Sequence, residues 1–242
     1  MDEAYAKVYG ELARTHWWWR ARDRAIEAGL NELVLPERGC RILDVGCGDG
    51  RLFTLLERFG EVSGLEPDPN TFGAPPPDPR IRHTPFVEPL PFDGPFDLVT
   101  LFDVLEHLED PVAALRLVAH SLRPGGIVFV TVPAFRALWT NHDVINHHRT
   151  RYAIGQLQAE FRAAGLTPTG HAYHFQGLVI SKLLSRLRER VLPSSPVPPA
   201  RPHGVVNAAV ERWFGLERRL MRPFRTWLPG TSLFAIGAKA SD

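Results

Sequence analysis

The sequence predicts an α/β fold built on a mostly parallel sheet, and two observations carry that prediction. Short apolar runs alternate with stretches of helical periodicity between residues 41 and 132, and strands that alternate with helices form parallel sheets with right-handed crossovers. The first apolar run also ends in a glycine-rich turn, which is typical of a strand that leads into a helix at a ligand site. A chain of 242 residues is long enough to bury the core of one elaborated domain.

The predicted elements follow in order along the chain. Residues 2–34 are expected to be helical, and Pro36 and Gly39 close that segment. The predicted strands are 41–45, 61–66, 96–102, 127–132, 166–175 and 232–238. The predicted helices are 51–59, a segment that ends at 122, 153–164 and much of 176–230. Little helix is expected in the connection 67–79, because it is rich in proline and glycine.

Composition and charge indicate an ordinary globular protein of the cytoplasm. The 28 Lys and Arg residues nearly balance the 27 Asp and Glu residues, so no global basic field points to nucleic acid. No apolar run approaches the roughly 18 residues of a membrane span, and charge from Asp2 onward argues against a signal peptide. Cys40 and Cys47 lack metal-ligand spacing, which favours a reducing compartment.

The loop Asp44–Gly50 reads DVGCGDG and follows a predicted strand. Its glycine spacing differs from the G-x-G-x-x-G of dinucleotide sites. A carboxylate at Asp44 would repel a pyrophosphate and suits a cationic ligand, while Glu66 at the end of the next strand is placed to accept hydrogen bonds from a ribose diol. We therefore expect a sulfonium nucleoside here. The alternative is that the glycines only make a tight turn.

Further motifs follow this loop along the chain, and their order and spacing form one pattern with it. They are Leu90-Pro91-Phe92 with the strand at 96–99, the run 103–111 that reads DVLEHLEDP, and the run 122–126 that reads LRPGG. Together they resemble the class I S-adenosylmethionine-dependent methyltransferases of type 11/12, over about residues 38–175 plus the last strand. The resemblance implies a Rossmann-like, seven-stranded, mostly parallel sheet whose last strand is antiparallel.

The resemblance also implies the cofactor site. Asp44, Gly46 and Gly48, with Cys47 between the glycines, would line the methionine moiety, and Glu66 would hold the ribose. Phe102 and Asp103 would close the site near the sulfonium. This sequence departs from the family at Phe86, where an aspartate often contacts the adenine amino group. Adenine recognition is therefore expected from the backbone and from apolar contacts of Phe86, Val87 or Pro67.

The stretch Thr15–Arg22 reads THWWWRAR. Three consecutive tryptophans on a helix cannot all face one core, because successive side chains are about 100° apart. A bacterial methyltransferase subgroup often found with polysaccharide and glycosyltransferase functions carries a similar N-terminal motif, H-[FW]-W-[FW]-R-x-R. That resemblance implies a helical lid bearing Trp19, with Arg20 or Arg22 on the methionine carboxylate. A core, interface or membrane-interface role for the tryptophans is the alternative.

Two groups of residues are candidates for chemistry on the acceptor. Asp103, Glu106 and His107 are spaced to share one helix face and could hold a divalent ion, as has been proposed for ubiquinone-biosynthesis O-methyltransferases, which resemble this stretch. We expect no metal, and the alternative role of these residues is to tie the start of a helix.

The second group lies in the run 139–152, which follows the predicted strand 127–132. His142 is the preferred general base, oriented by Asp143 or a neighbour, and His147 is second. The alternative is a loop that histidine and arginine hydrogen bonds organise without proton transfer.

Residues 176–230 carry ten basic and three acidic residues together with apolar stripes. Such helices can lie in a membrane interface, and the alternative is a helical cap on the sheet or on a partner subunit. The expected organisation is a lid at 1–37, a core at 38–175, this insert and a final strand at 231–242.

We expect an S-adenosylmethionine-dependent methyltransferase that yields S-adenosylhomocysteine. Its acceptor would be a small or lipid-linked molecule, with a glycan as one candidate and oxygen as the methylated atom. The protein would be a monomer or homodimer in the cytoplasm or peripheral at the inner membrane face. The alternative is a non-catalytic S-adenosylmethionine-binding or membrane-adaptor protein, and nucleic acid is not expected as a partner.

Overall fold

The computed structural model describes residues 12, 14–37, 39–68, 78–192 and 203–241. One seven-stranded sheet organises them in the order β3-β2-β1-β4-β5-β7-β6. All pairings are parallel except those of β7, which runs antiparallel to both β5 and β6. The predicted fold class is confirmed. The strands are β1 Arg41–Val45, β2 Glu61–Leu65, β3 Ile81–Arg82, β4 Phe96–Phe102, β5 Leu122–Pro133, β6 Leu166–His174 and β7 Ser232–Lys239.

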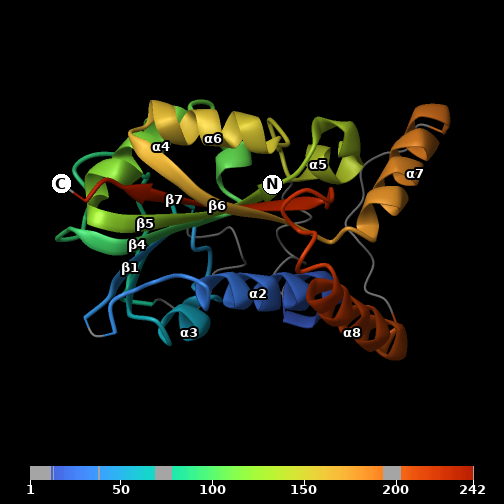
Figure 1. Cartoon of the computed structure of the whole chain (residues 1–242), viewed down its shortest axis with the longest axis horizontal. Coiled ribbons are helices and arrows are strands. Elements are labelled where there is room, and N and C mark those ends of the chain that lie inside the picture. Colours follow the sequence, from blue (N-terminus) through green and yellow to red (C-terminus); the bar gives the residue numbers. More distant parts are fainter. Residues whose placement is uncertain (1–11, 13, 38, 69–77, 193–202, 242) are drawn as a thin grey trace.

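Helices cover both faces of the sheet (Figure 1). One face carries α2 and α3, and the other carries α4 and α6. Every residue of β4 is buried, as expected for a central parallel strand with helices on both sides. The helices are α2 Trp17–Leu30, α3 Phe53–Leu56, α4 Pro111–Ser121, α5 Asn141–Ile145, α6 Ile154–Ala163, α7 Leu178–Val191 and α8 Gly204–Leu220, with short 3-10 turns at Leu105–His107 and Arg136–Leu138.

Several boundaries differ from the sequence-based expectation for identifiable reasons. The helix expected at 51–59 is regular only over α3. Strand β5 begins at Leu122 rather than at residue 127, because Leu122 already pairs with Phe96. Helix α4 starts only at Pro111, where the Asp110 side chain accepts a hydrogen bond from the Ala113 amide. Residues 2–11 of the expected first helix lie outside the described residues.

Helices α7 and α8 fill the long connection between β6 and β7. Helix α8 packs beside α2, where the Trp17 ring stacks on Phe214 with centroids 5.0 Å apart. Helix α7 extends at the same end of the molecule, and none of its side chains is buried (Figure 1). Within the described part of the chain, no helix combines the length and the apolarity needed to cross a membrane.

Candidate functional site

A cavity of about 1440 Å³ lies at the carboxyl ends of the parallel strands, where α/β sheets bind their ligands. Ligand pockets usually measure about 300–1,000 Å³, so this one has room for a nucleoside cofactor and a second molecule. Twelve of the thirteen residues predicted to bind the cofactor line it, namely Trp19, Arg22, Asp44, Gly46, Cys47, Gly48, Glu66, Pro67, Phe86, Val87, Phe102 and Asp103.

The glycine loop brings the backbone to the cavity. Gly46 and Gly48 have φ angles of 72° and 60°, a region that glycine adopts without strain. A Cβ atom on Gly46 would meet Val104 Cγ2 at 2.6 Å, so no side chain fits at this position. The Gly46 amide donates to the Leu65 carbonyl at 2.7 Å, which fixes the loop to the end of β2.

Two carboxyl groups face the cavity beside this loop. Asp44 is buried and accepts a hydrogen bond from Thr100 Oγ1 at 2.7 Å. Burial raises the pKa of Asp44 to about 7, although the Thr100 hydrogen bond and the Arg22 charge oppose that shift. Glu66 accepts hydrogen bonds from the amides of Gly48 at 3.1 Å and Asp68 at 3.2 Å. When ionised, both carboxyls only accept hydrogen bonds, and beside a closely approaching backbone they fit the amino group and the ribose hydroxyls of a sulfonium nucleoside.

The three tryptophans of α2 all line the cavity, but Trp17 packs on a different partner from Trp18 and Trp19. Trp19 is buried and meets Trp18 edge to face, with ring centroids 5.1 Å apart. Trp17 reaches Phe214 of α8 instead. The consecutive indoles therefore join the cavity wall, a small core cluster and the inserted helix.

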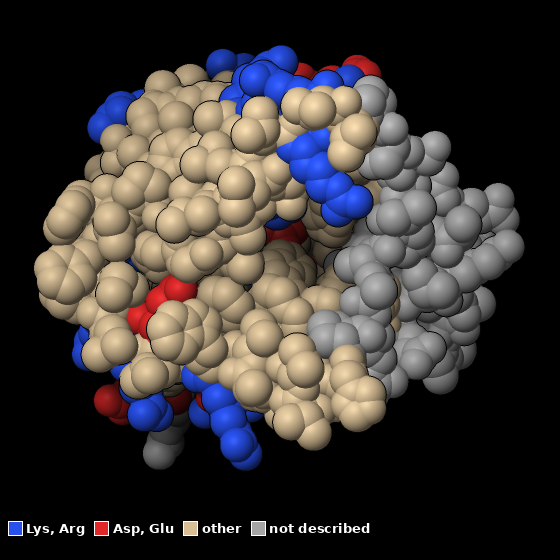
Figure 2. Space-filling model, turned by 90° about the vertical axis from the view of Figure 1, so that its right-hand side faces the viewer, with Lys and Arg blue, Asp and Glu red and all other residues tan. Residues whose placement is uncertain are grey.

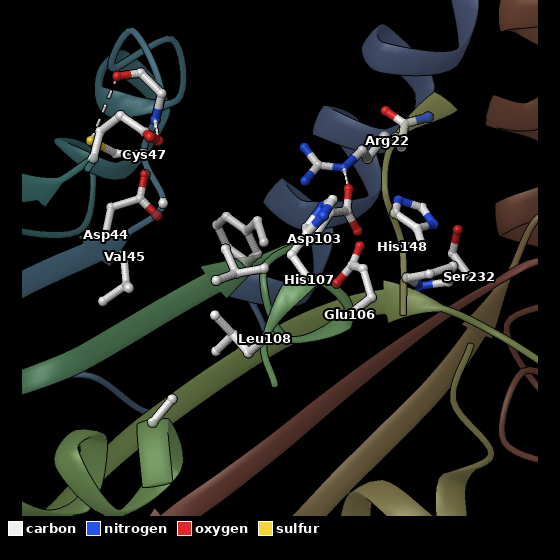
Figure 3. Close-up of a pocket in the computed structure, with 18 of the residues that line it drawn as sticks. Arg22, Asp44, Val45, Cys47, Asp103, Glu106, His107, Leu108, His148 and Ser232 are labelled. Carbon is white, nitrogen blue, oxygen red and sulfur yellow. Dashed lines mark hydrogen bonds and ion pairs between the residues drawn. The ribbon is translucent and has the colours of Figure 1, made fainter. Parts of the chain in front are cut away.

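The structure brings only one of the two predicted arginines to the cavity. Arg22 is buried, and its Nε lies 2.6 Å from Asp103 Oδ2 (Figure 3). Arg20 does not line the cavity and points to α8, where its guanidinium lies 3.1 Å from a carboxylate oxygen of Glu211. The two side chains diverge because residues two apart on a helix do not share a face.

The alternative metal set of Asp103, Glu106 and His107 does not come together as its spacing predicted. Residues 105–107 form a 3-10 turn, and Asp103 precedes it with a φ of 58° and pairs with Arg22. Among the described residues, the ligand atoms that gather within 4.8 Å of one another belong to Glu106, His107 and His148 (Figure 3). We call this group the acid–imidazole cluster.

Glu106 is the member of this cluster whose carboxyl no described residue satisfies. It is fully buried, lines the cavity, and neither carboxyl oxygen has a hydrogen-bond partner among the described residues. Burial, aided by the Asp103 charge, raises the pKa of Glu106 well above its usual range. This shift favours the protonated carboxyl, which can donate a hydrogen bond to a ligand.

Asp143 organises the wall of the cavity opposite the glycine loop. It is fully buried, and its Oδ1 accepts from His148 Nδ1 at 2.9 Å and from Arg151 Nε at 2.7 Å. Burial alone would raise the pKa of Asp143, but the His148 hydrogen bond and the Arg151 charge hold it well below its usual range. A carboxylate only accepts, so His148 Nδ1 carries a proton, and in the neutral imidazole the lone pair is then on Nε2.

The two histidines predicted as bases are placed differently from His148. His142 lines the cavity, but burial lowers its pKa to about 3, which makes it a weak base at neutral pH. His147 has a φ of 57° and does not line the cavity. Sequence reasoning missed His148 because its approach to Asp143 depends on the turn that follows α5. Their five-residue spacing is no helical repeat.

Comparisons with known proteins agree with this geometry. A family described as a methyltransferase domain matches residues 18–170, which is more than half of the chain. A ubiquinone biosynthesis O-methyltransferase of Paracidovorax citrulli is 29% identical over 193 residues, covering 72% of this chain and 74% of that protein.

Solved structures show the same fold. A Thermotoga maritima S-adenosylmethionine-dependent methyltransferase, described as a possible histamine N-methyltransferase, superposes with a TM-score of 0.58 at 17% identity over 97% of each chain. A Haemonchus contortus phosphoethanolamine N-methyltransferase 2, solved with S-adenosylhomocysteine, has a TM-score of 0.55 at 15% identity, over 90% of this chain and 52% of that one. The chain belongs to the class I S-adenosylmethionine-dependent methyltransferases, and S-adenosylmethionine is the cofactor of this enzyme.

Proposed function

We propose that this enzyme methylates a hydroxyl oxygen of its acceptor and that His148 is the general base. The observation that supports this proposal is His148, which lines the cavity and bonds through Nδ1 to the buried carboxylate of Asp143. S-adenosylmethionine supplies an electrophilic methyl group, so the protein must align the hydroxyl with it and remove the hydroxyl proton. His148 Nε2 takes that proton, and Asp143 stabilises the imidazolium that results. The printed name of the Paracidovorax relative, an O-methyltransferase, supports oxygen as the methylated atom.

The cofactor residues keep their expected roles within this proposal. Asp44 takes the amino group and Glu66 the ribose hydroxyls, because both carboxyls face the cavity beside the glycine loop. Arg22, rather than Arg20, takes the carboxylate, since it alone of the two lines the cavity. The apolar contacts to the adenine come from Pro67, Phe86 and Val87, which line the cavity together.

The rest of the cavity supports an acceptor with a polar, hydroxyl-rich head. Its lining includes Ser181, Lys182 and Ser185 of α7, with Thr140 and Asn141 at the start of α5. Hydroxyl, amide and ammonium groups are the partners that sugar hydroxyls require. We therefore propose a glycan or another polar head on a lipid carrier as the acceptor, which would bring the enzyme to the inner face of the membrane.

The test of the base is the pair of variants His148→Gln and His171→Gln. His171 is the matched control, because it lies on β6 outside the cavity lining. Transfer of a radiolabelled methyl group is measured over a panel of phenols, free sugars and polyprenyl-linked sugars, and S-adenosylhomocysteine affinity is measured by calorimetry.

We expect His148→Gln to lower kcat by about 10²–10⁴-fold with unchanged S-adenosylhomocysteine affinity, and the control to behave as wild type. Retained turnover in His148→Gln would show that another group is the base. Loss of turnover only in His142→Gln, with cofactor affinity intact, would return the role to His142.

A further inference from the structure

Helix α7 presents its polar face to the protein and its apolar face to the outside. The face that lines the cavity consists of Leu178, Ser181, Lys182, Ser185 and Glu189. The opposite face consists of Ile180, Leu183, Leu184, Leu187 and Val191, all 45–70% exposed. A surface helix of a globular protein has the reverse arrangement.

Helix α8 shows the same inversion except at Phe214, which is buried against Trp17. Its buried polar residues are Asn207, Glu211 and Glu217, which bond to the Trp17 amide, to Arg20 and Arg24, and to the Gly177 amide, respectively. Its outward apolar face consists of Val206, Trp213, Leu216 and Leu220, all 48–58% exposed. Two inverted helices at the same end of the molecule require a common explanation, because single exposed apolar residues are ordinary but groups of them on one end are not.

The charged residues of the two helices are also divided between an inner and an outer face. All their acidic residues turn inward, since Glu189 lines the cavity and Glu211 and Glu217 are buried. The exposed charges on α7 and α8 are all positive, namely Arg188, Arg190, Arg212 and Arg219. An outer face that combines aliphatic and aromatic side chains with uncompensated arginines complements an anionic lipid surface. Two copies of such a face would repel each other.

The cavity opens on this same end of the molecule. Figure 2 looks onto the end that bears α7 and α8, and a hollow with acidic side chains at its bottom lies in the middle of the view. The cavity-lining face of α7 forms part of its wall. Trp227 and Phe224, which follow α8, are 65% and 42% exposed and add aromatic side chains of the kind found at membrane–water interfaces.

We propose that the outer faces of α7 and α8 dock on an anionic lipid bilayer, so that the cavity mouth meets the membrane surface. A lipid-linked acceptor then enters from the bilayer, and α7 contacts lipid on one side and the acceptor head on the other. Only the route of the acceptor rests on the proposed function; docking itself does not. Docking therefore fails or succeeds independently of the role of His148.

The first test is flotation of the full-length protein with vesicles of phosphatidylglycerol and phosphatidylcholine, compared with phosphatidylcholine alone. The apolar variant is Leu184→Glu, Leu187→Glu and Trp213→Glu together. The matched control is Val34→Glu, because Val34 is 90% exposed and lies outside both helices. We expect wild type and the control to float with anionic vesicles only, and the apolar variant to stay in solution.

The second test separates the contribution of charge to vesicle binding from the contribution of apolar burial. The arginine variant Arg188→Glu, Arg190→Glu and Arg212→Glu should lower the partition coefficient at least about a hundredfold, because each surface arginine contributes a factor of about five. The matched control Arg162→Glu, on the exposed side of α6, should bind as wild type. Unchanged S-adenosylhomocysteine affinity shows that each variant is folded.

Three outcomes would overturn the proposal. Wild-type protein that does not float with anionic vesicles excludes bilayer docking. Equal binding by the variants and their controls places the contact elsewhere on the molecule. A wild-type dimer that becomes monomeric in the apolar variant without lipid identifies the face as a protein interface instead.

Discussion

The raised pKa of Asp44 predicts that cofactor affinity depends on pH near neutrality. Burial raises this pKa to about 7, and the Glu66 charge adds to the effect. A cationic amino group binds the ionised carboxylate. The ionised fraction grows from about one tenth at pH 6 to about nine tenths at pH 8, so the apparent dissociation constant should fall about tenfold over that range.

Calorimetric titration with S-adenosylhomocysteine at pH 6, 7 and 8 measures this change. At pH 6 the binding heat should also vary between buffers of different ionisation enthalpy, because Asp44 releases a proton on binding. Asp44→Asn should bind more weakly and show no such pH dependence, whereas Glu61→Gln, at an exposed position of β2, should behave as wild type. A wild-type affinity that stays constant from pH 6 to 8, or a tenfold change that persists in Asp44→Asn, would refute the reasoning.

The same carboxyl has the opposite effect on the stability of the free protein. A carboxyl whose pKa is raised by folding stabilises the folded state at low pH, and this contribution is lost as pH rises through the folded pKa. From a folded pKa of about 7, the loss between pH 6 and 8 is about 1.4 kcal/mol. Urea unfolding should show this decrease in wild type and not in Asp44→Asn.

Three further predictions follow from the site. Arg22→Ala should weaken S-adenosylhomocysteine binding about ten- to a hundredfold, while Arg20→Ala should leave it unchanged; the reverse in calorimetry would contradict the assignment. Gly46→Ala should lower the free energy of unfolding by about 1–3 kcal/mol, because of its positive φ and the close Val104 methyl, whereas Gly155→Ala, whose Cβ meets nothing within 4 Å, should not. A chelator should leave turnover unchanged if His148 is the base, and recovery of lost activity by a divalent ion would make the acid–imidazole cluster a metal site instead.

The parts of the fold that follow local rules were predictable from sequence. Strands β1 and β4 are nearly continuous apolar runs because helices cover both faces, and continuous runs are visible without a structure. Strand β3 was missed because two residues show no alternation. Strand β3 forms because it pairs with β2, and pairing between segments that are distant in the sequence leaves no local pattern.

The residues of the site also differ in how far the sequence could predict them. The glycine loop with Asp44 and Glu66 was found because backbone constraints impose residue types at fixed spacing. The Arg22–Asp103 pair joins α2 to the end of β4, and the Asp143–His148 pair depends on a turn, so neither has a periodic signal. For α7 the sequence showed an apolar stripe but not its direction, because amphipathicity does not specify which face meets the protein.

The charges of the cavity wall also separate the two ligands. Carboxyls lie at the ends of β1 and β2, where Asp44 and Glu66 line the cavity and, in the proposed arrangement, would receive the positively charged cofactor. The opposite wall carries Lys182 and Arg151, beside His148. Burial, reinforced by the Arg151 charge, lowers the pKa of Lys182 to about 8, so the ammonium still predominates at pH 7. Arg151 is paired with Asp143 at 2.7 Å, so Lys182 is the cation that an acceptor hydroxyl losing its proton beside His148 would meet, whereas beside Asp44 and Glu66 it would meet repulsion. This distribution of charge supports the proposal that cofactor and acceptor bind on different sides of the cavity.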